Sequence, residues 1–206
     1  MNLIAMKARL RSVFRTLSSR NYIGYGPMND IAKKNALTRV FLRKAPVIET
    51  GTYMGDMSRT FAKLGYEVHT IEVSRTLSDV IFPTLQSIGV HCYCGDSGVM
   101  LSKIMQKILN GGATKANFWL DGHWSGGITS RASDYETPIV NELNSIASYL
   151  PQFKSVVIAI DDVRCFGNNT SYPSKKYLID WAETHNLHFY FLTDIFVAST
   201  ETFNDL

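Results

Sequence analysis

With 206 residues, 45% of them hydrophobic and 19% charged, the chain is long enough for one domain with a substantial core. The net charge of +3 hides an asymmetry: five of the 21 basic residues precede the first acidic residue, Asp30, which leaves 16 basic against 18 acidic residues in the body. A slightly acidic body disfavours a nucleic-acid partner. The three cysteines are odd in number and lack the C-x-x-C spacing of a redox or zinc site, and a reducing, cytoplasmic compartment fits them best.

The first segment, residues 1–30, is predicted to hold a basic amphipathic helix. Apolar residues recur at helical spacing within residues 3–20, namely Leu3, Met6, Leu10, Val13 and Leu17. Its apolar runs are too short for a signal peptide or a spanning helix. Three interpretations remain open: a helix packed on the domain, a helix in peripheral contact with an anionic membrane, and a targeting presequence.

The remaining residues, 31–206, are predicted to form a single domain of alternating strands and helices. The expected strands are residues 46–49, 67–72, 90–94, 117–121 and 156–161. Helical periodicity is present at residues 57–64 and 101–109, and a further helix is expected to start at Pro138, with Thr137 as its N-cap. Residues 187–200 are predicted to form two antiparallel strands. This pattern is typical of the α/β class, with a doubly wound, mostly parallel sheet and an antiparallel C-terminal strand pair.

Each of the five predicted strands delivers an acidic residue to its carboxyl end. These residues are Glu49, Glu72, Asp96, Asp121 and the pair Asp161 and Asp162. In open α/β sheets, ligands bind in the crevice outside the carboxyl ends of the strands, so we expect the acids to line a binding site. The alternative is that aspartate caps helices at strand-to-helix turns, which explains any one of these positions better than all of them together.

The turn after the first strand, VIETGTYMGDMS, indicates which ligand it is built to hold. Gly51 and Gly55 would let the backbone pass close to a ligand, but Tyr53 replaces the central glycine of a dinucleotide fingerprint and would crowd a pyrophosphate. The amino-acid end of S-adenosylmethionine carries no phosphate, and Glu49 could attract its positive charge. Glu72 follows at about 20 residues, the spacing at which an acid accepts hydrogen bonds from ribose hydroxyls.

In order and spacing, these motifs resemble those of the class I S-adenosylmethionine-dependent methyltransferases. The resemblance covers residues 46–166 and rests on E-x-G-x-x-x-G, the acid of the second strand and the GDS turn. It implies a Rossmann-like fold with S-adenosylmethionine as cofactor. The cofactor-binding residues that it implies are Glu49, Gly51, Tyr53, Gly55, Glu72, Asp96, Ser97 and Asp121.

Within this class, the segments FWLDGH and IDD resemble the metal-dependent sugar O-methyltransferases of the macrocin O-methyltransferase type. By this resemblance Asp121, Asp161 and Asp162 would hold Mg²⁺, and His123 stands where relatives carry an aspartate general base. A hard cation can orient a hydroxyl and lower its pKa, and histidine is suited to take the proton. His123 is alternatively a turn histidine bonded to the backbone. Because consecutive strand residues point to opposite faces, Asp161 and Asp162 can share an ion only if the strand has ended there.

The sequence therefore predicts a cytoplasmic, metal-assisted O-methyltransferase acting on a hydroxyl of a sugar or glycan intermediate. Three other functions stay open: methylation of a catechol-like molecule or RNA, a nicotinamide-dependent oxidoreductase, which Tyr53 disfavours, and a binding module without activity. No feature of the sequence selects an oligomeric state.

Overall fold

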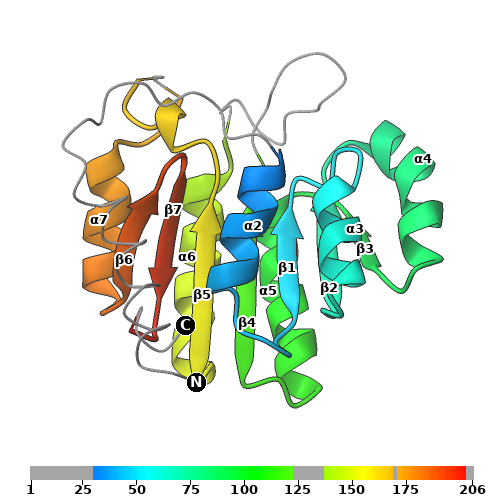
Figure 1. Ribbon diagram of the computed structural model, residues 1–206, viewed down its shortest axis with the longest axis horizontal. Coiled ribbons are helices and arrows are strands. Elements are labelled where there is room, and N and C mark those ends of the chain that lie inside the picture. Colours follow the sequence, from blue (N-terminus) through cyan, green and yellow to red (C-terminus); the bar gives the residue numbers. More distant parts are fainter. Residues whose placement is uncertain (1–29, 123–136, 169–170, 203–206) are drawn as a thin grey trace.

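The computed structural model describes residues 30–122, 137–168 and 171–202, which build one seven-stranded sheet with helices on both faces (Figure 1). The strand order is β3-β2-β1-β4-β5-β7-β6, and β7 alone among them runs antiparallel to the rest. The predicted fold class is therefore confirmed, including the antiparallel C-terminal strand pair.

The strands begin and end within two residues of the predicted bounds. They are β1 (Val47–Thr50), β2 (Val68–Glu72), β3 (His91–Cys94), β4 (Lys115–Leu120), β5 (Ser155–Ile160), β6 (His188–Leu192) and β7 (Ile195–Ser199). All six residues of β5 are buried, as its continuous apolar sequence predicts for a strand covered on both faces.

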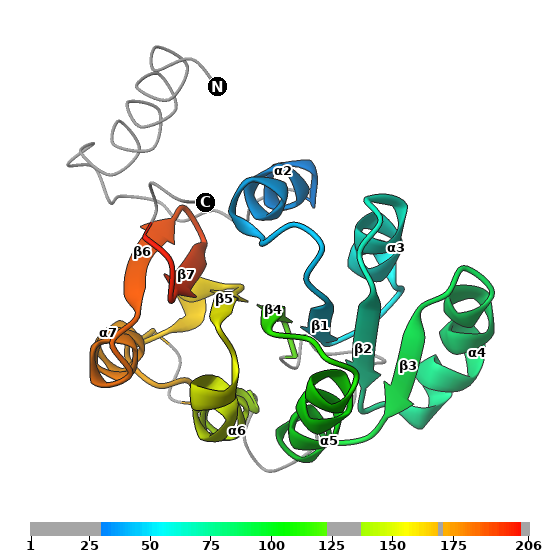
Figure 2. The same ribbon diagram turned by 90° about the horizontal axis from the view of Figure 1, so that it is seen from below.

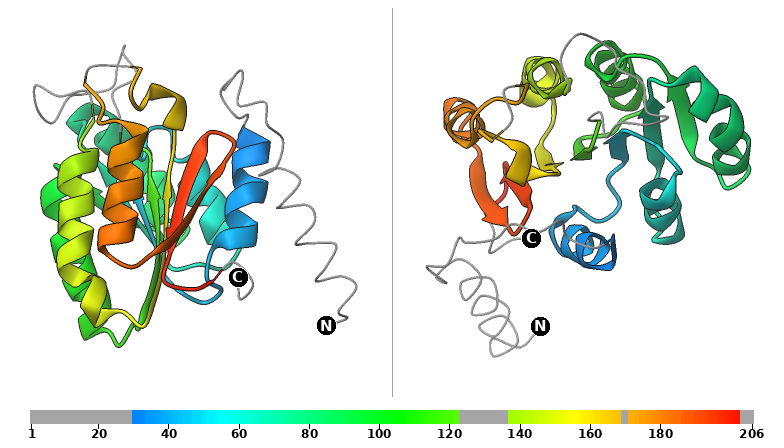
Figure 3. Two further views of the ribbon diagram at one scale, coloured as in Figure 1. Left: turned by 90° about the vertical axis from the view of Figure 1, so that its left-hand side faces the viewer. Right: turned by 90° about the horizontal axis from the view of Figure 1, so that it is seen from above.

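Within the described residues, helices lie on both faces of the sheet (Figures 2 and 3). On one face lie α2 (Asp30–Val40), α3 (Asp56–Lys63) and α4 (Arg75–Gln86); on the other lie α5 (Ser97–Asn110), α6 (Ile139–Tyr149) and α7 (Lys175–Thr184). Short 3₁₀ turns occupy Leu150–Gln152 and Val163–Cys165. Helix α6 starts one residue later than predicted, so Pro138 rather than Thr137 takes the cap position, although the Thr137 hydroxyl still accepts the Ile139 N–H at 3.3 Å.

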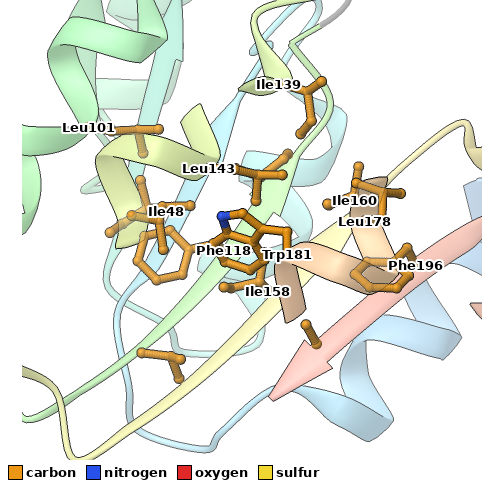
Figure 4. Close-up of a cluster of buried hydrophobic side chains, with 14 of the residues drawn as sticks. Ile48, Leu101, Phe118, Ile139, Leu143, Ile158, Ile160, Leu178, Trp181 and Phe196 are labelled. Carbon is orange, nitrogen blue, oxygen red and sulfur yellow. The ribbon is translucent and has the colours of Figure 1, made fainter. Parts of the chain in front are cut away.

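Alternation along the strands divides the core into two apolar layers. Phe118 of β4 and Ile158 of β5 face α5, α6 and α7, in the cluster that Figure 4 shows. Their neighbours Trp119 and Val157 face α2 and α3, where Leu37 is fully buried. Among the described residues, no helix is both long enough and apolar enough to cross a bilayer.

Candidate functional site at the carboxyl edge of the sheet

The carboxyl ends of β1 to β5 meet at the upper edge of the sheet in Figure 1, and every described residue of the predicted site lies at this edge. The strand order reverses between β1 and β4, which is the switch point where open α/β sheets bind ligands. The loops that follow these two strands therefore form the centre of the site.

Gly51 is required by the protein's own backbone. It has a φ of 82°, and a Cβ atom placed there would lie 2.8 Å from the carbonyl carbon of Asp121 and closer still to its oxygen. At Gly55, with a φ of 76°, a Cβ atom would instead meet the Leu85 side chain at 3.0 Å. The left-handed backbone and these internal contacts give both positions a reason to be glycine, and they neither require nor oppose the predicted approach of a ligand. Whether they also touch the cofactor stays a prediction.

Glu72 ties the first two loops of the site together. One carboxylate oxygen accepts the backbone N–H of Tyr53 at 2.9 Å, and the other accepts that of Ser74 at 2.8 Å. Tyr53 has a left-handed backbone with a φ of 46°, and its side chain is exposed. Because each carboxylate oxygen has a second lone pair, Glu72 can still accept ribose hydroxyls while it holds this loop. The position therefore fits its predicted role.

Asp96 is a helix cap. Its carboxylate accepts the N–H of Gly98 at 2.8 Å at the start of α5, and the preceding Gly95 donates its N–H to the Glu72 carbonyl at 2.9 Å. Ser97 is the first residue of α5 and is buried. The capping alternative considered for the row of acids accounts for Asp96, whose cofactor contact remains a prediction.

Glu49 is buried beneath the first loop. Its carboxylate accepts hydrogen bonds from the hydroxyls of Ser58 in α3 and Thr70 in β2, the latter at 2.7 Å. Burial, opposed by these two hydroxyls, raises the pKa of Glu49 to about 7. Only 1% of Glu49 is exposed, and its action on the positive end of the cofactor stays a prediction.

The predicted metal ligands come together on the α2 face of the sheet. Val157 and Ala159 of β5 face α2, and because side chains alternate along a strand, Asp161 lies on the same face. Asp162 has a left-handed backbone with a φ of 55°, so it leaves the strand pattern directly after β5 ends at Ile160. This satisfies the condition for two consecutive aspartates to reach one cation. Asp121 is close enough for its charge to act on Asp161.

The cation that these aspartates reach is a lysine. Lys33 of α2 forms an ion pair through Nζ with Asp161 Oδ2 and lies 3.8 Å from Asp162 Oδ1. Sequence reasoning missed this residue, although a signal was present: Lys33 falls on the same helical stripe as Leu37 and Val40, which are buried. A lysine on an apolar stripe needs a buried partner.

Arg164 is a second cation in contact with the acidic cluster. Arg164 Nη1 lies 2.5 Å from Asp162 Oδ1 and also bonds Asp194 Oδ2, a fully buried carboxylate between β6 and β7. Asp194 was also absent from the predicted site. Two basic side chains thus stand among four carboxylates, those of Asp121, Asp161, Asp162 and Asp194.

The pKa shifts of the ion pair follow from this crowding of charge. Burial, and then the charges of Asp121 and Asp162, raise the pKa of Asp161 to about 7, although Lys33 opposes them. Burial acts to lower the pKa of Lys33, but the charge of Asp161 and its hydrogen bond outweigh this, so the pKa lies above its ordinary value. Lys33 is therefore a persistent cation at neutral pH.

The carboxylate set by itself has the chemistry for a hard metal ion. Ligand oxygens of Asp161, Asp162 and Asp194 lie within 4.8 Å of one another. As arranged, however, they already bind the cations of Lys33 and Arg164. The Lys33 ammonium would repel a divalent ion about 4 Å away by about 8 kcal/mol at an effective dielectric constant of about 20, which opposes the attraction of the carboxylates. In the observed arrangement Lys33 and Arg164 pair with these carboxylates, so Mg²⁺ would compete with them, and the metal site stays a prediction.

A second group of metal-capable side chains lies at the amino ends of β2 and β3. Glu67 Oε1 lies 2.9 Å from His69 Nε2 and 3.8 Å from His91 Nε2. The two imidazole rings are stacked, with centroids 4.6 Å apart and planes at 24°. The Glu67 carboxylate lies near Nε2 of both rings, and this contact, together with the stacking, gives the two histidines a structural role.

Two predicted features lie outside the described residues: His123, the proposed base, and the basic helix of residues 3–20. The first described range ends at Gly122, and His123 is the next residue in sequence, two positions after Asp121. Its role as a base remains untested, as does the membrane contact of the first segment.

Comparison with known proteins identifies the fold. No protein-family model matches the sequence, and no curated protein matches it. The CcbJ methyltransferase of Streptomyces caelestis matches in structure with a TM-score of 0.52 and 12% identity, over 87% of this chain and 92% of that chain. A TehB-like S-adenosylmethionine-dependent methyltransferase of Corynebacterium glutamicum (TM-score 0.48, 13% identity, 96% and 98% covered) and the magnesium protoporphyrin IX methyltransferase of Synechocystis (0.48, 12%, 95% and 94%) also match. At such identities the likeness shows the fold alone.

Proposed function

We propose that this protein is an S-adenosylmethionine-dependent O-methyltransferase acting on a hydroxyl of a sugar or glycan intermediate. The observation that carries the proposal is the position of Glu72, which bonds the backbone of the first loop at the edge where the strand order reverses. An acid at the end of the second strand is suited to accept the hydroxyls of a ribose. The inserted antiparallel β7 also differs from the 3-2-1-4-5-6 order of the dinucleotide-binding sheets, which disfavours the nicotinamide alternative.

In this proposal the acidic residues at the carboxyl edge of the sheet bind the cofactor and the acceptor. S-adenosylmethionine supplies the activated methyl group. Glu72 would bind its ribose, and the buried charge of Glu49 would favour its positive end. The acceptor hydroxyl would lie against the cluster of Asp121 and Asp161, where a cation can stabilise the negative charge that develops on the oxygen. The sequence resemblance implies Mg²⁺ at Asp121, Asp161 and Asp162, which would require Lys33 to withdraw. His123 is the predicted proton acceptor.

Titration calorimetry tests the cofactor part of the proposal. S-adenosylmethionine or its demethylated product should bind the wild type, whereas NAD should not. Glu72→Ala should weaken binding by about 1.5–3 kcal/mol, the value of hydrogen bonds to a charged group. Glu67→Ala is the matched control, because Glu67 is an exposed acid that directly precedes β2, far from the carboxyl end where Glu72 lies. Unchanged affinity in Glu72→Ala, or preferential binding of NAD, would contradict the proposal.

The acceptor class is tested separately by release of the demethylated cofactor. Sugar and oligosaccharide acceptors should support turnover, whereas catechols and RNA should not. Turnover with RNA or a catechol alone would leave the methyltransferase assignment intact and overturn the sugar acceptor.

A further inference from the structure

Helix α2 places Lys33 with little freedom. Leu37, one turn further along, is fully buried against the sheet. The end of the helix is fixed by Asn117 of β4, whose side chain accepts the N–H of Leu42 at 2.7 Å and donates to the carbonyl oxygen of the same residue at 3.0 Å. The Lys33 side chain is only 14% exposed at the acidic cluster. Its ammonium is therefore a built part of the site and not a mobile surface charge.

The carboxylate that Lys33 binds keeps one oxygen for another donor. Asp161 is fully buried, and its Oδ2 is bound to Lys33. Its Oδ1 has no hydrogen-bond partner within the described part of the chain. A buried carboxylate oxygen without a donor is costly, so this atom indicates a further group at the site. A hydroxyl placed between Lys33 Nζ and Asp161 Oδ1 would donate a hydrogen bond to the carboxylate oxygen and accept one from the ammonium.

We propose that Lys33 is the resident cation of the acidic cluster and takes the place of the divalent metal in positioning the acceptor hydroxyl. The positioning of an acceptor hydroxyl rests on the proposed function, whereas the replacement of the metal by Lys33 does not. Lys33 supplies a fixed positive charge beside Asp161 and Asp162, as a bound metal would, and leaves Asp161 Oδ1 to receive the hydroxyl. Lys33 is thus a positioning residue.

The proposal makes an unusual prediction about metal affinity. Removing the ammonium should uncover Asp161 and Asp162 and create a site for Mg²⁺ or Mn²⁺. Lys33→Met keeps the apolar stem of the side chain without its charge. The matched control is Lys34→Met, which removes the adjacent lysine of the same helix. Titration calorimetry with MnCl₂ at constant ionic strength, without cofactor or acceptor, measures the affinities directly.

We expect Mn²⁺ to bind Lys33→Met at least tenfold more tightly than it binds the wild type or Lys34→Met. Removal of divalent metal ions with a chelator should leave wild-type turnover unchanged. Millimolar Mn²⁺ should partly restore turnover in Lys33→Met, which a merely structural lysine would not allow. The proposal would be overturned if the wild type bound Mn²⁺ tightly, or if Lys33→Met folded and bound Mn²⁺ no more tightly than the wild type.

If Lys33→Met does not fold, the melting temperature of the wild type decides. A large increase on addition of Mg²⁺ contradicts the proposal, and an unchanged melting temperature supports it. These titrations need no substrate, so failure of the proposed function would show separately, in the cofactor titration.

Discussion

The contact between the first and fourth loops yields a prediction about stability. In Gly51→Ala the new Cβ atom would lie 2.8 Å from the Asp121 carbonyl carbon and 3.0 Å from the Gly122 Cα atom. These are backbone atoms, so they cannot move aside as a flexible side chain would. Gly65 has the same φ of 82°, and a Cβ atom added there would meet nothing within 4 Å, which makes Gly65→Ala a matched control.

Both substitutions carry the penalty of a left-handed alanine, about 1–2 kcal/mol. Gly51→Ala adds the cost of forcing two backbone segments apart, which overpacking experiments place at about 1–3 kcal/mol or more. We therefore expect urea denaturation to show a free energy of unfolding about 1–3 kcal/mol lower for Gly51→Ala than for Gly65→Ala. Equal losses in the two variants would refute the contact between these loops. Gly51→Ala should also weaken cofactor binding, because it displaces Asp121.

Three further predictions concern Glu49, the first segment and His123. The folded pKa of Glu49, about 7, exceeds its unfolded value, so its contribution is fully present below the unfolded pKa and is lost as pH rises through 7. Between pH 4.5 and 8, the free energy of unfolding should therefore fall less in Glu49→Gln than in the wild type, by up to about 3 kcal/mol, as measured by urea denaturation. The same dependence on pH in both proteins would contradict this. Deleting residues 1–20 should abolish binding to anionic vesicles in a sedimentation assay and leave cofactor affinity intact; a truncated chain that fails to fold would instead assign the segment to the domain. His123→Ala should lower turnover by about 10² to 10⁴, less at high pH, and wild-type activity across the pH range would exclude it as the base.

The sequence alone determined the features that depend on local pattern. The apolar run of β5 predicted a strand buried on both faces, and the acid at the end of each parallel strand predicted the edge at which a site would form. Both follow from alternation of side chains and from the common direction of parallel strands, which a short window of sequence contains. The condition on Asp161 and Asp162 was of the same kind, and the left-handed backbone of Asp162 meets it.

Tertiary structure decided what lies opposite each of these residues. Lys33 and Asp161 are 128 positions apart, and their ion pair exists because α2 packs across β4 and β5, which no local pattern specifies. Gly51 likewise meets the loop after β4, a contact that its motif did not indicate. Hydrophobic periodicity fixes which face of an element is buried. The partner on that face is set by how the whole sheet twists and which helix covers it. The helical stripe could therefore mark Lys33 as a buried cation, but only the tertiary structure pairs it with Asp161.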